Sequence, residues 1–279
     1  MLKGKIKLKG DKSISHRIVI FGALSTGSCV IKNLSTCDDV QKTINILKGC
    51  NINIENKNNG STIIKGGKFS NHITEFDCGN SGSTARFMLG LLPSRGINGI
   101  LYGDQSLSSR PMGRVIEPLN QMNINIKNSE NKLPLIFKKS NVKSINYTLQ
   151  IPSAQVKTAL IFAALSCDNK SYINDPFNTR DHTERIIQYL GHKKTAFCKF
   201  NITPFNFTVP GDISSASFII SAAILIPKSN IIIENLLYND TRIGYIKVLK
   251  KMGANIEVYN KRNICNEPVV DMKIKYTNN

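Results

Sequence analysis

The stretch SISHRIVIFGALSTGS, from Ser13 to Ser28, starts with small polar residues and then becomes apolar on nearly every side. A helix without a polar face packs against other elements on all sides, so this stretch predicts a buried helix. The same plan returns in SGSTARFMLGLLPSRG, SAQVKTALIFAALSCD and SSASFIISAAILIPKS, which begin at Ser81, Ser153 and Ser214. This internal repeat decides the fold class, because each copy must be one unit of a repeated architecture.

Between the buried stretches lie amphipathic ones, each with the apolar stripe of a surface helix. They are DDVQKTINILKGCNINI, RPMGRVIEPLNQMNINI, RDHTERIIQYLGH and TRIGYIKVLKKMGANIEV. All but the third run into a short β-branched segment that is typical of a strand. The repeated unit is therefore βαβαββ, and it predicts an α/β fold with mixed sheets outside and buried helices inside. A Pro-Gly turn in VPGDISSAS (residues 209–217) indicates a domain break before the fourth buried stretch.

The first three buried stretches also carry a cation one helical turn after a small residue at their start. The pairs are Ser13 and Arg17, Gly82 and Arg86, and Ser153 and Lys157. Free backbone N–H groups, a small residue and a cation on one face are what an anion site at a helix N-terminus requires. A structural interpretation stays open, in which Ser or Gly caps the helix and the cation extends to solvent. The occurrence of such starts in register favours anion sites.

The formal net charge of +18 calls for an anionic partner, yet the lysines are dispersed among asparagines and isoleucines. An enzyme that acts on phosphorylated substrates accounts for this charge, and nucleic-acid binding is kept as the less favoured alternative. The 7 cysteines form no C-x-x-C pair and the histidines lack metal spacing, which favours reduced thiols, a cytoplasmic protein and no metal. No apolar run reaches the roughly 18 to 20 residues that a membrane span needs.

A series of blocks gives the chain a family resemblance: GDKSISHR, CGNSGSTARFM, SSRPMGRVIEPL, IPSAQVKTALIFAAL, TRDHTER, PGDISSASF and TRIGYIKVLKKMGA. In their order and spacing the chain resembles the 5-enolpyruvylshikimate-3-phosphate synthase (3-phosphoshikimate 1-carboxyvinyltransferase) family over nearly its whole length. The sister family of UDP-N-acetylglucosamine enolpyruvyl transferases shares the fold but is a poorer match, because its first motif lacks the lysine, serine and arginine trio. The resemblance implies buried parallel helices surrounded by sheets, an inside-out α/β barrel, in a cytoplasmic monomer.

The resemblance also implies a reaction and the residues that serve it. The enolpyruvyl group of phosphoenolpyruvate passes to the 5-hydroxyl of shikimate-3-phosphate, and phosphate is released, in aromatic amino-acid (chorismate) biosynthesis and without metal or cofactor. For shikimate-3-phosphate it implies binding by Lys12, Ser13, Arg17, Ser153, Ala154, Gln155 and Arg180. For phosphoenolpyruvate it implies Lys12, Gly82, Arg110 and Gln155, with Lys12 and Arg110 as catalytic residues and Arg86 in a structural role.

Members of this family are longer, and the sequence ends where the later repeats of their second lobe begin. We therefore expect a complete first lobe of three βαβαββ repeats over residues 12–211. Residues 1–11 and 212–279 should form an incomplete second lobe that includes the first strand and leaves an apolar face of the 214–226 helix uncovered. No residue of the tail matches the family's proton-accepting aspartate or the lysine–glutamate pair, and Glu267 and Asp271 are interpreted as surface charges.

These departures lead to an expectation about activity. We expect weak binding of shikimate-3-phosphate and negligible turnover by this chain alone, because it lacks the general acid and base. A separate C-terminal fragment is the partner that would complete it. The alternative belongs to another functional class: a non-catalytic remnant that binds phosphorylated metabolites.

Overall fold

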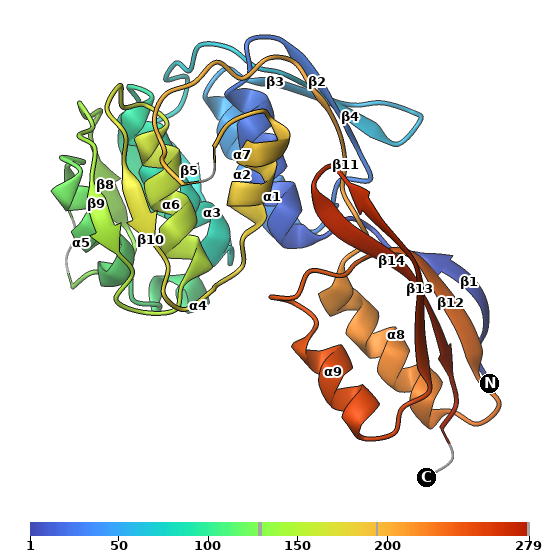
Figure 1. Cartoon of the computed structure of the whole chain (residues 1–279). Helices are drawn as coiled ribbons and strands as arrows, with labels where there is room; N and C mark the ends of the chain where they lie inside the picture. Colours follow the sequence, from blue (N-terminus) through green and yellow to red (C-terminus); the bar gives the residue numbers. More distant parts are fainter. Residues whose placement is uncertain (128–129, 194, 278–279) are drawn as a thin grey trace.

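The computed structural model describes residues 1–127, 130–193 and 195–277 of the chain. The predicted buried stretches form helices α1 (Lys12–Ala23), α3 (Gly82–Ser94), α6 (Ala154–Ala164) and α8 (Ile213–Leu225). In α1, α3 and α6 almost every side chain beyond the first turn is buried, whereas α8 buries one face only. Figure 1 shows α1, α3 and α6 in the interior of one body, with sheets around them. The predicted α/β fold with buried helices is confirmed.

The amphipathic stretches form helices α2 (Asp38–Gly49), α5 (Gly113–Gln121), α7 (His182–Tyr189) and α9 (Gly244–Lys251). A further single turn, α4 (Gln105–Ser108), precedes Arg110. Helix α9 buries only Ile246, whereas α2, α5 and α7 turn their apolar stripes inward; in α2, for example, Val40, Ile44 and Leu47 are buried. These helices therefore cover the outside of the buried ones, as their periodicity predicts.

The strands pair in one recurring pattern. One sheet has the order β11-β2-β4-β3, with β2 (Ser28–Lys32), β3 (Asn53–Asn56), β4 (Ser61–Lys65) and β11 (Asn206–Thr208). A second has the order β5-β6-β8-β7, with β5 (Glu75–Asp77), β6 (Gly99–Tyr102), β7 (Ile126–Lys127) and β8 (Leu135–Phe137). In each, the first pair is parallel and the others are antiparallel, which is the pairing that a repeated βαβαββ unit gives. Strands β9 (Asn146–Thr148) and β10 (Tyr172–Asn174) form a parallel pair of their own.

The remaining sheet has the order β1-β12-β14-β13 and repeats the same pattern. It is built from β1 (Lys3–Lys7), β12 (Asn230–Leu237), β13 (Ile256–Ile264) and β14 (Glu267–Lys275). Figure 1 shows it together with α8 and α9, apart from the other elements. The predicted pairing of the first strand with the segment after residue 211 is thus confirmed, since β1 lies parallel to β12.

We call the part that contains α1 to α7 and the sheets around them the first body, and the part that contains β1, α8, β12, α9, β13 and β14 the second body. The chain passes between these two bodies at two adjacent points. Gly10 and Gly211 form an isolated antiparallel bridge, and the N–H of Asp11 donates to the carbonyl of Pro210 at 2.8 Å. Gly10 has room for no side chain, because a Cβ there would lie 2.0 Å from the carbonyl oxygen of Asn33. The two crossings are therefore bonded to each other and tightly packed.

Aromatic side chains join the buried helices in the core. Phe162 of α6 packs edge-on against Phe21 of α1 and Phe87 of α3, with ring centroids 5.5 and 5.7 Å apart. Gly90 of α3 allows the closest approach to α6, since a Cβ there would lie 2.1 Å from the carbonyl oxygen of Ala159. This packing fixes the three helices side by side, and with them their N-termini.

One expectation about charged residues is wrong. Glu267, interpreted from the sequence as a surface charge, is fully buried, and its Oε1 lies 2.7 Å from Nδ1 of the equally buried His182. Asp271 is mostly buried as well and is paired with Arg262 at 2.8 Å. Both carboxylates hold structure in the second body, which their apolar neighbours in the sequence do not reveal. No helix in the described ranges has the length and apolar character that crossing a membrane requires.

Candidate active site

The N-termini of α1, α3 and α6 open onto one cavity with a volume of about 640 Å³. Each helix is capped by a side-chain oxygen that accepts a hydrogen bond from a backbone N–H of the first turn. The caps are Asp11 to Ile14 at 3.0 Å, Ser81 to Thr84 at 3.1 Å and Ser153 to Val156 at 3.3 Å. Because Asp11 is the cap of α1, Lys12 is its first helical residue and projects toward the cavity.

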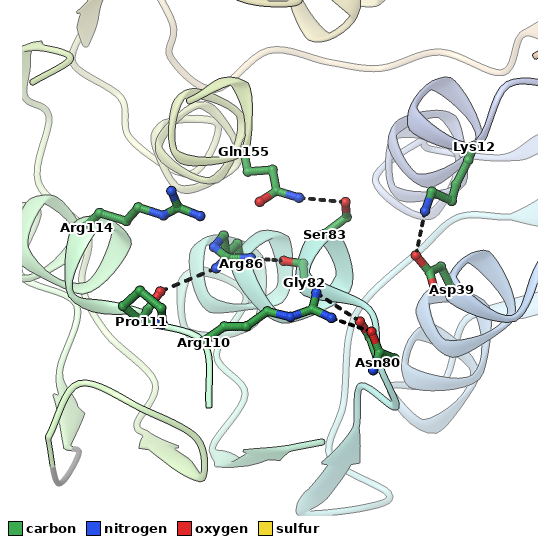
Figure 2. A pocket seen from close by; sticks show the side chains of 10 residues that line it. All are labelled: Lys12, Asp39, Asn80, Gly82, Ser83, Arg86, Arg110, Pro111, Arg114 and Gln155. Carbon is green, nitrogen blue, oxygen red and sulfur yellow. Dashed lines mark hydrogen bonds and ion pairs between the residues drawn. The ribbon is translucent and has the colours of Figure 1, made fainter. Parts of the chain in front are cut away.

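The cavity wall combines residues from several elements, as Figure 2 shows. Its lining residues are Lys12, Asp39, Asn80, Gly82, Ser83, Arg86, Arg110, Pro111, Arg114 and Gln155. Gln155 joins two of the helices, because its side-chain amide donates to the hydroxyl of Ser83 at 3.0 Å. Among the residues expected from the sequence, the wall thus brings together Lys12, Gly82, Arg110 and Gln155. Ser13, Arg17, Ser153, Ala154 and Arg180 are not among its lining residues.

Positive charge dominates this wall. Arg86 is buried and donates to the carbonyls of Gly82 at 3.0 Å and Pro111 at 3.4 Å. Burial, followed by the charges of Arg114 and Arg110, lowers the pKa of Arg86 to about 10. Within the described residues none of these three guanidinium groups has an ion pair with a carboxylate, while Lys12 is paired with Asp39 at 2.9 Å. A cluster of like charges without counter-ions, at helix N-termini, is suited to binding an anion.

Gly82 is required by the close approach of two of these arginines. A Cβ at this position would lie 2.5 Å from Nη1 of Arg86 and 3.5 Å from Nη1 of Arg110. Arg110 itself is held at the rim by the side chains of Asn80 and Ser106. The small residue therefore leaves the start of α3 open for the two guanidinium groups and for a ligand.

Arg17 lies beneath Ser13, in the protein interior. Its Nε donates to Thr183 at 2.7 Å, Nη2 to Thr158 at 2.8 Å and Nη1 to the carbonyl of Ser13 at 2.7 Å. Burial lowers the pKa of Arg17 to about 10, an effect that the charges of Glu184 and Asp11 partly oppose. Arg17 and Arg86 are both almost completely buried, so neither extends to solvent. The structure places Arg17 where it fixes the backbone at Ser13.

Lys157 does not have the role expected from its place one turn after Ser153. Its Nζ lies 2.8 Å from Asp175 and 2.6 Å from Glu184, and only 4% of its side chain is exposed. Two carboxylates thus occupy this cation, so the expectation that it receives an anion is wrong. All three cations are buried, but only Lys157 is paired with carboxylates of the described residues, so the similarity among the three helix starts ends at α6.

The sequence reasoning missed Asp39, Asn80, Ser83, Pro111 and Arg114 as cavity residues. Asp39 lies in the first turn of a surface helix, and nothing in the sequence indicates that this turn adjoins the start of α1. Arg114 could have been predicted as a cavity residue, because it lies four residues after Arg110 in the same short segment, SSRPMGR. No group of His, Cys, Asp or Glu side chains suited to a metal ion occurs in the described part of the chain.

Comparisons with known proteins show the family to which this chain belongs. The family described as "EPSP synthase (3-phosphoshikimate 1-carboxyvinyltransferase)" matches residues 1–278. A 3-phosphoshikimate 1-carboxyvinyltransferase of Endomicrobium trichonymphae is 39% identical over 99% of this chain and 67% of its own length. Another, of Caldicellulosiruptor saccharolyticus, is 42% identical over 93% of this chain and 63% of its own length.

A solved structure of EPSP synthase from Acinetobacter baumannii superposes with a TM-score of 0.88 at 32% identity. It covers 98% of this chain, which in turn covers 64% of it. The chain therefore spans about two thirds of the length of these relatives. Since the family match extends over almost every residue, the chain belongs to the EPSP synthase (3-phosphoshikimate 1-carboxyvinyltransferase) family.

Proposed function

We propose that this chain carries the substrate-binding part of a 3-phosphoshikimate 1-carboxyvinyltransferase, which transfers the enolpyruvyl group of phosphoenolpyruvate to shikimate-3-phosphate. The observation that supports this most is the cavity at the starts of α1, α3 and α6. There Arg86, Arg110 and Arg114 have no carboxylate partner among the described residues. Both substrates are phosphorylated carboxylates, and fixed guanidinium and N–H donors match that charge.

The residues have distinct proposed roles. Lys12, at the edge of the cavity, contacts both substrates, while Gly82, Arg110 and Gln155 bind phosphoenolpyruvate. Shikimate-3-phosphate lies toward the starts of α1 and α6, on Ser13, Ser153, Ala154 and Gln155, with Arg180 nearby. Arg17 supports this side through its hydrogen bond to the Ser13 carbonyl.

The proposed chemistry needs charge stabilisation and three proton transfers, from the 5-hydroxyl to a base, from an acid to C3, and later from C3 to a base. The 5-hydroxyl oxygen bonds to C2 of phosphoenolpyruvate and loses its proton, while C3 gains one, which gives a tetrahedral intermediate. The C2–phosphate bond then breaks, and C3 loses a proton, so that the double bond is restored. The arginines stabilise the phosphate as it leaves.

The proton-transfer groups are proposed to come from a second polypeptide. Asp39 is the only carboxylate among the described lining residues, and it is paired with Lys12. The relatives contain a further third of their length beyond the part that this chain matches. An unpaired apolar face on α8, with Phe218 79% and Leu225 74% exposed, supports docking of such a polypeptide. All 7 cysteines are free thiols, which fits a cytoplasmic protein.

Reconstitution tests this function. The chain is mixed with a polypeptide equivalent to the last third of the Endomicrobium relative, and phosphate release from both substrates is measured. We expect turnover only with both polypeptides, its loss in Arg110→Met, and its retention in Lys48→Met, which removes an exposed positive charge from α2. A stable complex that binds shikimate-3-phosphate without turnover would overturn the catalytic proposal in favour of a non-catalytic binding protein.

A further inference from the structure

A buried arginine from the second body reaches the first body at the crossing between the two. Arg242 precedes α9, and only 4% of its side chain is exposed. Its Nη1 lies 2.9 Å from Oδ2 of Asp11 and 3.2 Å from Nε2 of His182. Its Nη2 donates to the hydroxyl of Ser214 at 2.8 Å and lies 3.6 Å from Asp212. One guanidinium thus contacts the N-termini of α1, α7 and α8.

The contact with Asp11 bears directly on the start of α1. Asp11 is fully buried, and its Oδ1 caps the helix by accepting from the N–H of Ile14. Its Oδ2 has no hydrogen-bond partner among the described residues, so the charge of Arg242 is what compensates it. Asp212 lies 3.6 Å from the same guanidinium, so two carboxylates meet here, and burial together with the charge of Asp11 raises the pKa of Asp212. Without Arg242 they would repel one another at the residue that precedes Lys12.

The contact with His182 bears on the start of α7 in the same way. Nδ1 of His182 lies 2.7 Å from Glu267, and Nε2 faces the cation. Because a guanidinium group can only donate, Nε2 accepts from Arg242, and Nδ1–H donates to Glu267. A continuous chain of contacts runs from Glu267 in β14 through His182 and Arg242 to Asp11.

Arg17 holds the same two helix starts through other atoms. Its Nε donates to Thr183, the neighbour of His182, and its Nη1 donates to the carbonyl of Ser13. The two arginines, one from each body, thus both contact the segments that carry Lys12 with Ser13 and Arg180. Arg242 is not a lining residue of the cavity.

We propose that Arg242 is a positioning residue for shikimate-3-phosphate: from the second body it fixes the starts of α1 and α7, and through them Lys12, Ser13 and Arg180, without contacting the ligand. This inference rests on the proposed function. Arg242 is then the residue that couples the position of the second body to the binding residues of the first body. It is also distinct from stabilisation alone, because it concerns the geometry of two short segments.

The test is calorimetric titration of shikimate-3-phosphate into the full chain and its variants. We expect Arg242→Met to weaken binding at least about tenfold, as expected for a residue in a coupled ionic network, and Arg242→Lys to recover most of the loss. The double variant Asp11→Asn, Arg242→Met removes the uncompensated carboxylate while asparagine keeps the cap, so it should bind more tightly than Arg242→Met alone. Arg262→Met is the control, because it breaks another ion pair of the same body, to Asp271, while the hydrogen bonds of Arg262 go to Asn235, Asn260 and Asp271 and to none of these helix starts.

The possible outcomes distinguish the positioning role of Arg242 from the proposed function. Unchanged affinity in Arg242→Met, or equal weakening in Arg262→Met, would overturn the positioning role alone. If Arg242→Met fails to fold, the double variant and Arg242→Lys decide. The double variant still lacks the contact to His182, so it should bind more weakly than Arg242→Lys, and equal affinity in these two variants would overturn the positioning role. Absence of binding by the unmodified chain would overturn the proposed function and this inference with it.

Discussion

Because Gly82 has no side chain, two guanidinium groups can lie close to the start of α3. In Gly82→Ala the new Cβ would lie 2.5 Å from Nη1 of Arg86, so the arginine must move. We expect the Kd for phosphoenolpyruvate to rise about tenfold, because one displaced charged hydrogen bond is worth roughly 1.5 kcal/mol. Titration of phosphoenolpyruvate into the reconstituted complex measures this Kd.

The control for that substitution is Gly244→Ala at the start of α9. A Cβ there meets nothing within 4 Å, so neither binding nor stability should change. Equal effects of the two substitutions would show that the alanine acts through the backbone and not through Arg86.

A second residue-scale prediction concerns His16, which is fully buried and bonded through Nδ1 to Thr43 at 2.8 Å. Burial lowers the pKa of His16 from 6.5 to about 3, with the charges of Arg17 and Lys12 adding to the effect. Between these values the unfolded chain binds a proton that the folded ring does not. Its contribution to stability is therefore present at neutral pH and falls by about 1.4 kcal/mol per unit as the pH drops below 6.5.

In His16→Asn the stability deficit relative to the unmodified chain should therefore shrink on acidification. Denaturant unfolding at pH 7, 5.5 and 4.5 measures it. His72→Asn, at an exposed histidine, should show no such trend. A deficit in His16→Asn that stays constant with pH would mean that the folded ring is protonated.

Among the helices, α6 is joined to α7 by one buried lysine and by a hydrogen bond of 2.7 Å between Thr158 and Thr183. Lys157→Met would leave Asp175 and Glu184, 11% and 14% exposed, without their cation. We expect a loss of about 3–5 kcal/mol in the free energy of unfolding, as found when one partner of a buried ion pair is removed. Lys247→Met, which breaks the exposed pair with Asp240, should cost less than about 1 kcal/mol. A small loss in Lys157→Met would instead indicate that this lysine is free to meet an anion.

The helices were predictable because each pattern is local: an apolar stretch with no polar face must be buried, whatever surrounds it. The partners of the charged residues could not be predicted, because they come from distant segments of the chain. Lys157 was misjudged since its acids are Asp175 and Glu184, and Glu267 since its partner His182 lies 85 residues away. Arg86 and Gly82 were found through the repeat, whereas Asp39 needed the packing of α2 beside α1.

At the scale of the molecule, the two bodies differ in how completely their helices are covered. Ile213, Ala216, Ile220 and Ala223 form the one buried face of α8, while Phe218 and Leu225 are exposed. The double variant Phe218→Ser, Leu225→Ser should change the free energy of unfolding by less than about 1 kcal/mol, because little buried area is lost. It should also reduce self-association and docking of the complementary polypeptide.

Sedimentation velocity compares this variant with Phe177→Ser, which removes an exposed aromatic side chain in the loop before Arg180 and leaves α8 unchanged. Reduced association in both would point to general stickiness and not to the α8 face. Full docking of the complementary polypeptide to the double variant would show that it binds elsewhere.

The central claim is that the starts of the buried helices bind a phosphorylated shikimate through Lys12. Calorimetric titration of shikimate-3-phosphate into the chain tests it most directly, with Lys12→Met as the site variant and Lys48→Met as the control for charge. We predict one binding site per chain, unchanged affinity in Lys48→Met and binding lost in Lys12→Met. No binding by the unmodified chain, or equal binding by all three, would contradict the claim.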